Sequence, residues 1–480
     1  MKIHFIGIGG IAISGIANIY KQKGHKVQGS DVESSEITEE LKKQGIKVFI
    51  GHKKENLRYQ ERHARVRRVH GSGRLLPNLV VYSEAVPQNN SELKEARRLK
   101  IECLSGAQVL AALSKDYFTI AVSGMHGKST TASMIAQILI KAGFDPSFII
   151  GTKPGWRLGK SKYLIIEADD YQAKFLHYYP DILVLTNIEE EHMDFFKNFQ
   201  HIIKVFRQYT KQVKDYIVAN KDNENVLKIL NPKSEILNLK WFGKRTILSQ
   251  AEGQIQNSKL QKIKKRPEIK FYSLKDKEAS KVSKILRVPG KHNVSNALAA
   301  LQTARLLKIN DKVSFKALSE YKGVWRRFEI SKFEICNLKF EIVSDYAHHP
   351  TEIEATLQAA TEKFKNKKIW LVFQPHQYQR TFYLFSRFVK TFALAQKKFN
   401  VANLIITDIY TVEGRESQTI KNKVNSQKLV EAINKSWAIY LPQNQVLDYL
   451  AANLKGGEVI IIMGAGNVYK LAERFSTGLN

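Results

Sequence analysis

The residues best suited to chemistry form one short glycine-rich segment, made of Gly124, Met125, His126, Gly127, Lys128, Ser129 and Thr130. The segment fits GxxGK[ST], a shortened phosphate-loop pattern, and stands between an apolar strand pattern and a helical apolar period that stops at Gly143. Glycines allow backbone N–H groups to approach phosphate oxygens, and a helix N-terminus adds partial positive charge. Lys128 is expected to reach the terminal phosphates, and the Ser129 hydroxyl to bind Mg²⁺. The segment therefore predicts an ATP site.

Two later apolar runs end in side chains that could complete a metal site. YLIIEADD places Glu167 at the end of an expected strand, and LVLTNIEEEHMD places His192 just beyond another. Mg²⁺ takes oxygen ligands and few protein groups, so one carboxylate with phosphates and water would suffice. Imidazole prefers softer metals, so spacing alone favours a solvated loop histidine at His192 and leaves Glu167 open.

A second glycine loop stands near the N-terminus, where Gly7, Gly9, Gly10 and Ala12 fit GxGxx[GA] after an apolar strand pattern. Taken alone, with Asp31 as the ribose ligand, this fingerprint would indicate a nicotinamide dehydrogenase. A diphosphate of another nucleotide can use the same backbone donors, however, and hydride transfer needs no separate ATP loop. Two anionic ligands in two domains, one of them ATP, is the better interpretation.

The elements that position these residues follow one repeated pattern of short apolar strand, turn and amphipathic helix. Stretches with this pattern begin near Ile3, Tyr117 and Phe328. Such alternation predicts an α/β fold with mostly parallel sheets, and 480 residues suffice for about three domains of ~100–200 residues. Several of the expected strands end on polar or glycine residues, where open α/β sheets hold ligands.

Bulk composition restricts the class of protein. No apolar run approaches the ~20 residues of a membrane helix, and MKIHFIGIGG lacks a signal-peptide pattern. Two cysteines support neither a disulfide framework nor a thiolate metal site, so a cytoplasmic location is expected. The formal net charge of +31 raises the alternative of a nucleic-acid-associated ATPase. The chain lacks the interleaved aromatic and basic track that would support single-strand binding, so we expect no nucleic-acid partner.

Two segments do not fit the strand–helix rhythm. Arg58–Leu76 is Arg-rich in an otherwise Lys-rich chain and shows no apolar periodicity, which favours a surface insertion over an added binding arm. Gln250–Lys284 is basic and weakly patterned. We interpret it as strands and loops at the edge of the middle domain.

The motifs, in their order along the chain, resemble those of the Mur ligases over nearly all of its length. The matching segments are HFIGIGGIAISGIA, YSEAVP, SGMHGKSTT, EADD, TNIEEEHMD, GKHNVSNALAAL, WRRFE, SDYAHHPTEI, FQPHQYQRT and IIIMGAGNVY. The resemblance implies a Rossmann-like UDP-sugar-binding domain (1–115), a central ATP-binding domain (116–327) and a C-terminal Rossmann-like domain that binds an amino acid (328–480).

The resemblance also implies an activity. FQPHQYQRT favours the members that join L-alanine to the lactyl carboxylate of UDP-N-acetylmuramate, in bacterial cell-wall synthesis. The carboxylate would attack the γ-phosphate of ATP to give an acyl phosphate, which the amine of L-alanine then attacks. Catalysis would be mainly positioning and charge neutralisation. Ligation of a recycled tripeptide to the same sugar stays open as the nearest alternative.

Site residues follow from the same resemblance. It implies catalytic roles for Lys128, Glu167 and His192, with Mg²⁺ held by Ser129, Glu167 and His192. Beyond the phosphate loop, the expected ATP contacts are Asn293, Asn296, Arg327 and Asp345. The expected UDP-sugar contacts are Gly7, Gly9, Gly10, Ser14, Ser30, Asp31 and Ser83. The expected amino-acid contacts are His376 and Arg380, whose guanidinium could pair with a carboxylate.

Each assignment has a plainer alternative, and some residues depart from the family pattern. Asn293 and Asn296 could be helix caps, and Asp345 could cap a turn. The adjacent His348 and His349 show no third metal ligand in the sequence. EADD replaces the commoner EADE, Gln377 stands where some relatives carry Arg, and GTKPGWRLGKSKY is short for a segment that helps to bind the sugar.

Overall fold

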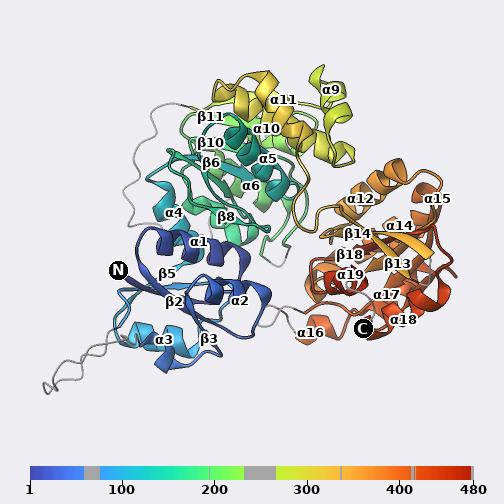
Figure 1. The fold of residues 1–480 in the computed structure, drawn as a ribbon, viewed down its shortest axis with the longest axis horizontal. Coiled ribbons are helices and arrows are strands. Elements are labelled where there is room, and N and C mark those ends of the chain that lie inside the picture. Colours follow the sequence, from blue (N-terminus) through green and yellow to red (C-terminus); the bar gives the residue numbers. More distant parts are fainter. Residues whose placement is uncertain are drawn as a thin grey trace, which may run out of the picture.

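The computed structural model describes residues 1–58, 76–193, 195–231, 266–335, 338–411, 416 and 418–476. They form three sheets of five, seven and six strands, each covered by helices, which confirms the expected three-domain α/β fold (Figure 1).

The first sheet has the order β3-β2-β1-β4-β5 and is parallel throughout. Its strands are β1 (Lys2–Ile6), β2 (Lys26–Asp31), β3 (Lys47–Ile50), β4 (Leu79–Tyr82) and β5 (Glu102–Ser105). The accompanying helices are α1 (Ile11–Gln22), α2 (Glu36–Lys43), η1 (Lys54–Leu57), α3 (Ser91–Arg98) and α4 (Gly106–Ser114). The chain order reverses between β1 and β4, so the crevice at the carboxyl ends of these strands is where such a sheet holds a ligand.

The second sheet has the order β12-β11-β10-β6-β9-β7-β8, parallel except for the β7–β8 pair. Its strands are β6 (Phe118–Ser123), β7 (Ser147–Ile149), β8 (Trp156–Arg157), β9 (Tyr163–Glu167), β10 (Ile182–Leu185), β11 (Tyr216–Asn220) and β12 (Glu268–Tyr272). The helices are α5 (Lys128–Lys141), η2 (Tyr171–His177), α6 (Phe199–Thr210), α7 (Glu224–Leu230), α9 (Glu278–Ile285), α10 (Lys291–Leu306) and α11 (Asp311–Ser319).

The central strands of this second sheet are buried on both faces. Ile120 and Val122 enter the core under α5, α10 and α11, whereas Ala121 enters the opposite core with residues of η2 and α6. Continuous apolar strands are expected wherever helices cover both sides of a parallel sheet. This double cover leaves only the strand ends for polar side chains, and the carboxyl ends of β6, β9 and β10 carry the phosphate loop, Glu167 and the loop of His192.

The third sheet has the order β13-β14-β18-β15-β16-β17, parallel except for the β13–β14 hairpin. Its strands are β13 (Glu329–Ile335), β14 (Leu338–Asp345), β15 (Ile369–Phe373), β16 (Val401–Ile406), β17 (Ala438–Tyr440) and β18 (Val459–Met463). The helices are α12 (Pro350–Lys363), α13 (Tyr378–Tyr383), α14 (Phe385–Ala393), α15 (Ala395–Phe399), α16 (Gln418–Lys421), α17 (Ser426–Ile433), η4 (Gln443–Gln445), α18 (Val446–Asn453) and α19 (Tyr469–Ser476).

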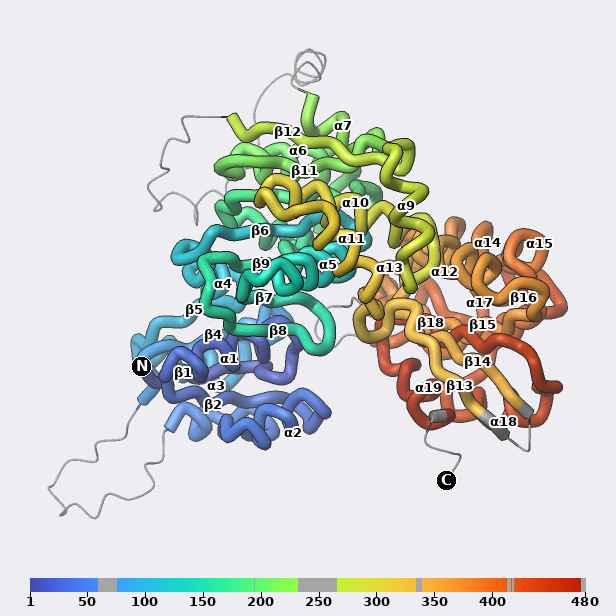
Figure 2. The backbone as a smooth tube through the Cα atoms, turned by 45° about the horizontal axis from the view of Figure 1, so that its top comes forward, coloured from blue at the N-terminus to red at the C-terminus, as the bar shows by residue number. Residues whose placement is uncertain are grey.

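The three domains meet near the carboxyl ends of the parallel strands of their sheets. One apolar core runs from the first domain into the second, where α1 packs against β8. Figure 2 shows the C-terminal domain beside the other two, with α12 close to the helices of the middle domain. Residues distant in sequence can therefore share one site.

The two irregular segments have different outcomes. Most of Arg58–Leu76, and residues 250–265 of the second segment, lie outside the described residues. In the remainder, β12 is an edge strand as expected, but Glu278–Ile285 forms helix α9, which corrects the expectation of strands and loops alone. Ala279 and Val282, three residues apart, give α9 a buried face that the surrounding charge obscures in the sequence.

Among the described residues, none of the helices combines the length and the apolar character needed to cross a bilayer.

Candidate active site

The phosphate loop occupies the turn between β6 and α5, and two of its glycines have no room for a side chain. Gly124 has φ +129°, and a Cβ there would lie 2.2 Å from the Thr186 hydroxyl oxygen. Gly127 has φ +82°, and its Cβ would lie 2.4 Å from Asn296 Oδ1. Both backbone conformations are unfavourable for L residues. The glycine spacing is therefore a requirement of this turn.

The Lys128 side chain folds back over the loop. Its ammonium donates to Gly124 O (2.7 Å), Met125 O (3.0 Å) and Asp170 Oδ1 (2.8 Å). The pKa of Lys128 is held above its usual value. Burial opposes this shift, but the attraction of Asp170 and of neighbouring carboxylates outweighs the effect of burial. Lys128 is thus a fixed positive charge beside the phosphate loop, and Asp170, itself fully buried, is its counter-ion.

The expected metal ligands gather around this ion pair. Ser129 Oγ donates to Glu167 Oε2 at 2.8 Å, which brings a hydroxyl and a carboxylate together. His192 Nε2 lies 3.6 Å from Asp170 Oδ2, a buried oxygen without a hydrogen-bond partner among the described residues. Hard oxygen donors and an unsatisfied carboxylate oxygen fit a small divalent cation such as Mg²⁺.

Two cavities, each of about 410 Å³, flank the loop. The first is lined by predicted ATP contacts from the middle and C-terminal domains, namely His126, Gly127, Thr130, Asn293, Asn296, Arg327 and Asp345. The second lies between the first and middle domains and is lined by residues that include Gly10, Ser83, Ser129 and Glu167. Arg327 lines both. Arg327 therefore lies at the boundary between the two cavities.

The polar residues of the first cavity are held by hydrogen bonds that identify their structural roles. Helix α10 has Gly290 as its N-cap, so Asn293 and Asn296 are not its caps. Asn293 Nδ2 donates to Pro289 O at 2.7 Å. Asp345 accepts from Phe328 N (2.7 Å) and also, at 2.8 Å, from the backbone N–H two residues further on, as a turn-capping aspartate would. Burial raises the pKa of Asp345.

The residues expected to bind the UDP-sugar do not all face the second cavity. Gly10 and Ser83 line it. Gly9 N donates to Asp31 Oδ2 at 2.7 Å, so this carboxylate holds the glycine loop. The Ser14 hydroxyl donates to a backbone carbonyl within α1. Ser30 is buried and donates to Glu92 Oε2 at 2.5 Å, which directs its hydroxyl into the core of the domain.

The other expected glycine, Gly7, packs directly against the end of β4. Its φ is +75°, and a Cβ there would lie 3.0 Å from Ser83 Cβ. The glycine therefore brings the carboxyl ends of β1 and β4 together at the topological switch point.

The residues expected to bind the amino acid, His376 and Arg380, lie together in the C-terminal domain. Arg380 Nη1 lies 2.9 Å from His376 Nδ1, and Arg380 Nε donates to Glu191 Oε1 at 2.8 Å. Burial and the nearby Arg380 charge hold the pKa of His376 well below its usual value, so this imidazole is neutral. Arg380 and Glu191 belong to different domains and are both buried, so this ion pair joins the C-terminal domain to the middle one.

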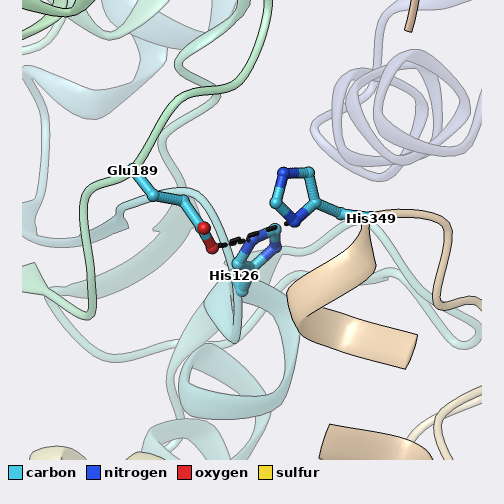
Figure 3. Close-up of side chains that lie close together, drawn as sticks. All are labelled: His126, Glu189 and His349. Atoms are coloured by element: carbon cyan, nitrogen blue, oxygen red, sulfur yellow. Dashed lines mark ion pairs between the residues drawn. The ribbon is translucent and has the colours of Figure 1, made fainter. Parts of the chain in front are cut away.

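A charged cluster surrounds the phosphate-loop histidine (Figure 3). His126 Nε2 lies 2.6 Å from Glu189 Oε1, and His126 Nδ1 lies 3.1 Å from Glu352 Oε1. Burial opposes the charge, but the two carboxylates raise the pKa of His126 to about 10. His126, Glu189 and His349 place one ligand atom each within 4.8 Å of one another. Because both His126 nitrogens face carboxylates, the arrangement is that of an imidazolium held between two anions.

Sequence reasoning missed four acids of this site: Asp170, Glu191 and Glu352, which are buried, and Glu189, which is partly exposed. All four belong to motifs that were singled out, EADD, TNIEEEHMD and SDYAHHPTEI, within a few residues of the chosen positions. The signal that could have indicated these acids was the number of acidic residues at expected strand ends in a strongly basic chain. It could not identify the individual residues, because which of several neighbouring acids faces inward depends on the loop backbone.

Family models match the chain in three consecutive parts. The Mur ligase family catalytic domain matches residues 2–118, the Mur ligase middle domain residues 122–304, and the Mur ligase glutamate ligase domain residues 326–466. The chain belongs to the Mur ligase family.

Curated relatives of this Mur ligase align over nearly the whole chain. A UDP-N-acetylmuramate–L-alanine ligase from Acetivibrio thermocellus is 39% identical over 98% of this chain and 95% of its own. One from Clostridium acetobutylicum is 35% identical over 99% of this chain and 97% of its own. The similarity therefore extends through all three domains.

Solved structures share the fold. The UDP-N-acetylmuramate-alanine ligase of Thermotoga maritima superposes with a TM-score of 0.71 and 23% identity, covering 99% of this chain and 98% of that one. A murein peptide ligase from Psychrobacter arcticus has a TM-score of 0.65 and 21% identity, covering 99% and 98%. The three-domain architecture of this Mur ligase is thus that of known relatives.

Proposed function

We propose that this Mur ligase joins L-alanine to the lactyl carboxylate of UDP-N-acetylmuramate, with cleavage of ATP to ADP and phosphate, in peptidoglycan precursor synthesis. The observation that carries the proposal is the position of Arg327 and the phosphate loop between two cavities of similar size. The curated relatives that match the full chain bear the name of this reaction.

We assign ATP to the cavity between the middle and C-terminal domains. Gly127 and Thr130 present the start of α5 to it, and Asn293 and Asn296 of α10 also line it. The α5 N-terminus favours anionic phosphate. Within these assignments, residues 1–115 bind the UDP-sugar, 116–327 bind ATP, and 328–480 bind the amino acid.

We assign the sugar to the second cavity. The N-terminus of α1 borders it at Gly10 and can accept the diphosphate, while Ser129 and Glu167 border its other end. A UDP-sugar in this orientation would extend its carboxylate toward the phosphate loop. The loop that includes Gly151 is short for this family, but it contributes to the wall of this cavity and so still contacts the site.

Ser129, Glu167 and His192 would hold Mg²⁺, which supplies positive charge to the phosphates. Lys128 is placed to exchange its contact with Asp170 for a terminal phosphate oxygen. Arg327 reaches the same place from the boundary of the two cavities. These cationic groups neutralise charge where the carboxylate oxygen attacks the γ-phosphorus atom and ADP leaves.

The amino acid would then attack the carbonyl carbon of the acyl phosphate. Its nitrogen forms the new C–N bond, its excess proton passes to solvent, and phosphate leaves with the former carboxylate oxygen. We propose that Arg380 holds the amino-acid carboxylate, because this buried guanidinium lies beside the loop of His192. We also propose a cytoplasmic location, because the proposed reaction uses ATP and the chain has only two cysteines.

The test is phosphate release from ATP and Mg²⁺ with UDP-N-acetylmuramate, across single amino acids and a tripeptide. We expect release that requires both the sugar and L-alanine, with the conjugate identified by mass. Phosphate release that requires the tripeptide instead of L-alanine would indicate ligation of a recycled tripeptide to the same sugar. Phosphate release without the sugar would contradict the proposal.

A further inference from the structure

One carboxylate of the C-terminal domain contacts both cationic side chains at the boundary of the ATP cavity. Glu352 Oε1 lies 3.1 Å from His126 Nδ1 and accepts from Arg327 Nη1 at 3.3 Å. His126 belongs to the phosphate loop, and Arg327 lines both cavities. The side chain of Glu352 is 9% exposed, so these interactions are little screened by water.

The second oxygen of the same carboxylate has a different task. Glu352 Oε2 accepts from His348 N at 3.1 Å and from His349 N at 3.4 Å, in the capping box that begins α12. This bond fixes the carboxylate relative to the helix, so the first oxygen has a defined position. Helix α12 therefore presents a rigid negative charge to the phosphate loop of another domain.

The position of this carboxylate indicates a purpose beyond stability. A buried carboxylate is costly unless paired, and this one lies against a cavity that we assign to an anion. A negative charge beside bound phosphates is unfavourable in itself. It becomes useful when it keeps two positive side chains aimed at the phosphates, because preorganised charge costs no rearrangement during the reaction.

We propose that Glu352 is a positioning residue that orients Arg327 and His126 toward the terminal phosphate of ATP when the C-terminal domain docks. The inference rests on the proposed function and deepens it, by naming the carboxylate that connects domain docking to the phosphate site. Glu352 itself touches no reacting atom.

Glu352→Gln is the variant that tests the proposal. The amide oxygen of glutamine can still accept the backbone N–H groups at the start of α12, so the cap is kept. Its NH₂ group would then face two donors, and the charge that holds Arg327 is lost. We expect the affinity for a non-hydrolysable ATP analogue to fall about tenfold while that for ADP, which lacks the terminal phosphate, changes less than about twofold.

The binding measurements use the full chain with Mg²⁺ and either nucleotide, without sugar or amino acid, so their outcome is separate from that of the proposed ligation. If the wild type ligates no amino acid but the split between analogue and ADP appears, the function fails and the positioning stands. Glu362→Gln, on the exposed end of the same helix, is the matched control and should leave both affinities unchanged.

Two results would overturn the proposal. Equal loss of affinity for analogue and ADP would indicate a structural role alone. Tighter binding of the analogue would show that Glu352 merely repels phosphate. Where ligation is active, we also expect kcat at saturating substrates to fall about tenfold or more in Glu352→Gln.

Discussion

Replacement of Lys128 by Met should damage stability as well as turnover, because of the partner that it leaves behind. Asp170 is fully buried, and its Oδ1 receives the Lys128 ammonium at 2.8 Å. Removing one member of a buried ion pair leaves an uncompensated charge, at a cost of about 3–5 kcal/mol. For a domain of this size, about 2–4 °C per kcal/mol applies, so the transition that includes the middle domain should fall by about 6–20 °C.

Adding Asp170→Asn to Lys128→Met separates the loss of stability from the loss of turnover. In the double variant no buried charge remains unpaired, so we expect at least half of the lost stability to return, while turnover stays absent without the ammonium. Thermal unfolding of wild type, both single variants and the double variant forms the complete cycle. A shift below about 2 °C for Lys128→Met, or a double variant no more stable than it, would refute the reasoning.

Three further outcomes follow from the site. Gly127→Ala should weaken ATP binding at least about tenfold with little change in sugar affinity, because its Cβ would lie 2.4 Å from Asn296 Oδ1; equal ATP affinity by calorimetry would contradict the steric argument. Ser129→Ala removes the hydroxyl that donates to Glu167, so half-maximal turnover should require several-fold more Mg²⁺; an unchanged Mg²⁺ titration would remove this residue from the metal site. His126 has a pKa raised to about 10 from an ordinary value of 6.5, so its stabilising contribution is complete below about pH 6.5 and is lost as pH rises through 10. The melting temperature of wild type should therefore fall more between pH 7 and 10 than that of His126→Asn, and parallel slopes would argue against a charged His126.

Much of the fold could be predicted because each domain repeats a local pattern of short apolar strand, turn and amphipathic helix. Apolar runs such as IAVS and VIIIM fit strands buried on both faces, and the helical period after the phosphate loop ends near Gly143 as α5 does. The helix α9 escaped prediction because its buried face consists of two small apolar residues among lysines. A weak amphipathic pattern cannot be separated from a loop without its neighbours.

The candidate site was predictable to a smaller extent. Gly127, Asn296 and Arg327 are distant in sequence, yet all three line one cavity. The direction of individual side chains was not available, because it depends on the docking of one domain against another. Ser30 shows this limit, since its hydroxyl faces the buried Glu92 instead of a cavity. Glu352 shows it too, because its partner His126 lies in another domain.

The central claim is that a carboxylate from one cavity meets the terminal phosphate of ATP from the other, and isotope transfer tests it directly. UDP-N-acetylmuramate with both lactyl carboxylate oxygens labelled with ¹⁸O would be converted with L-alanine, ATP and Mg²⁺, and the released phosphate analysed by mass spectrometry. An acyl phosphate requires one ¹⁸O in the phosphate and one in the new amide. Unlabelled phosphate, with the second label released into water or carried by ADP instead, would contradict the account.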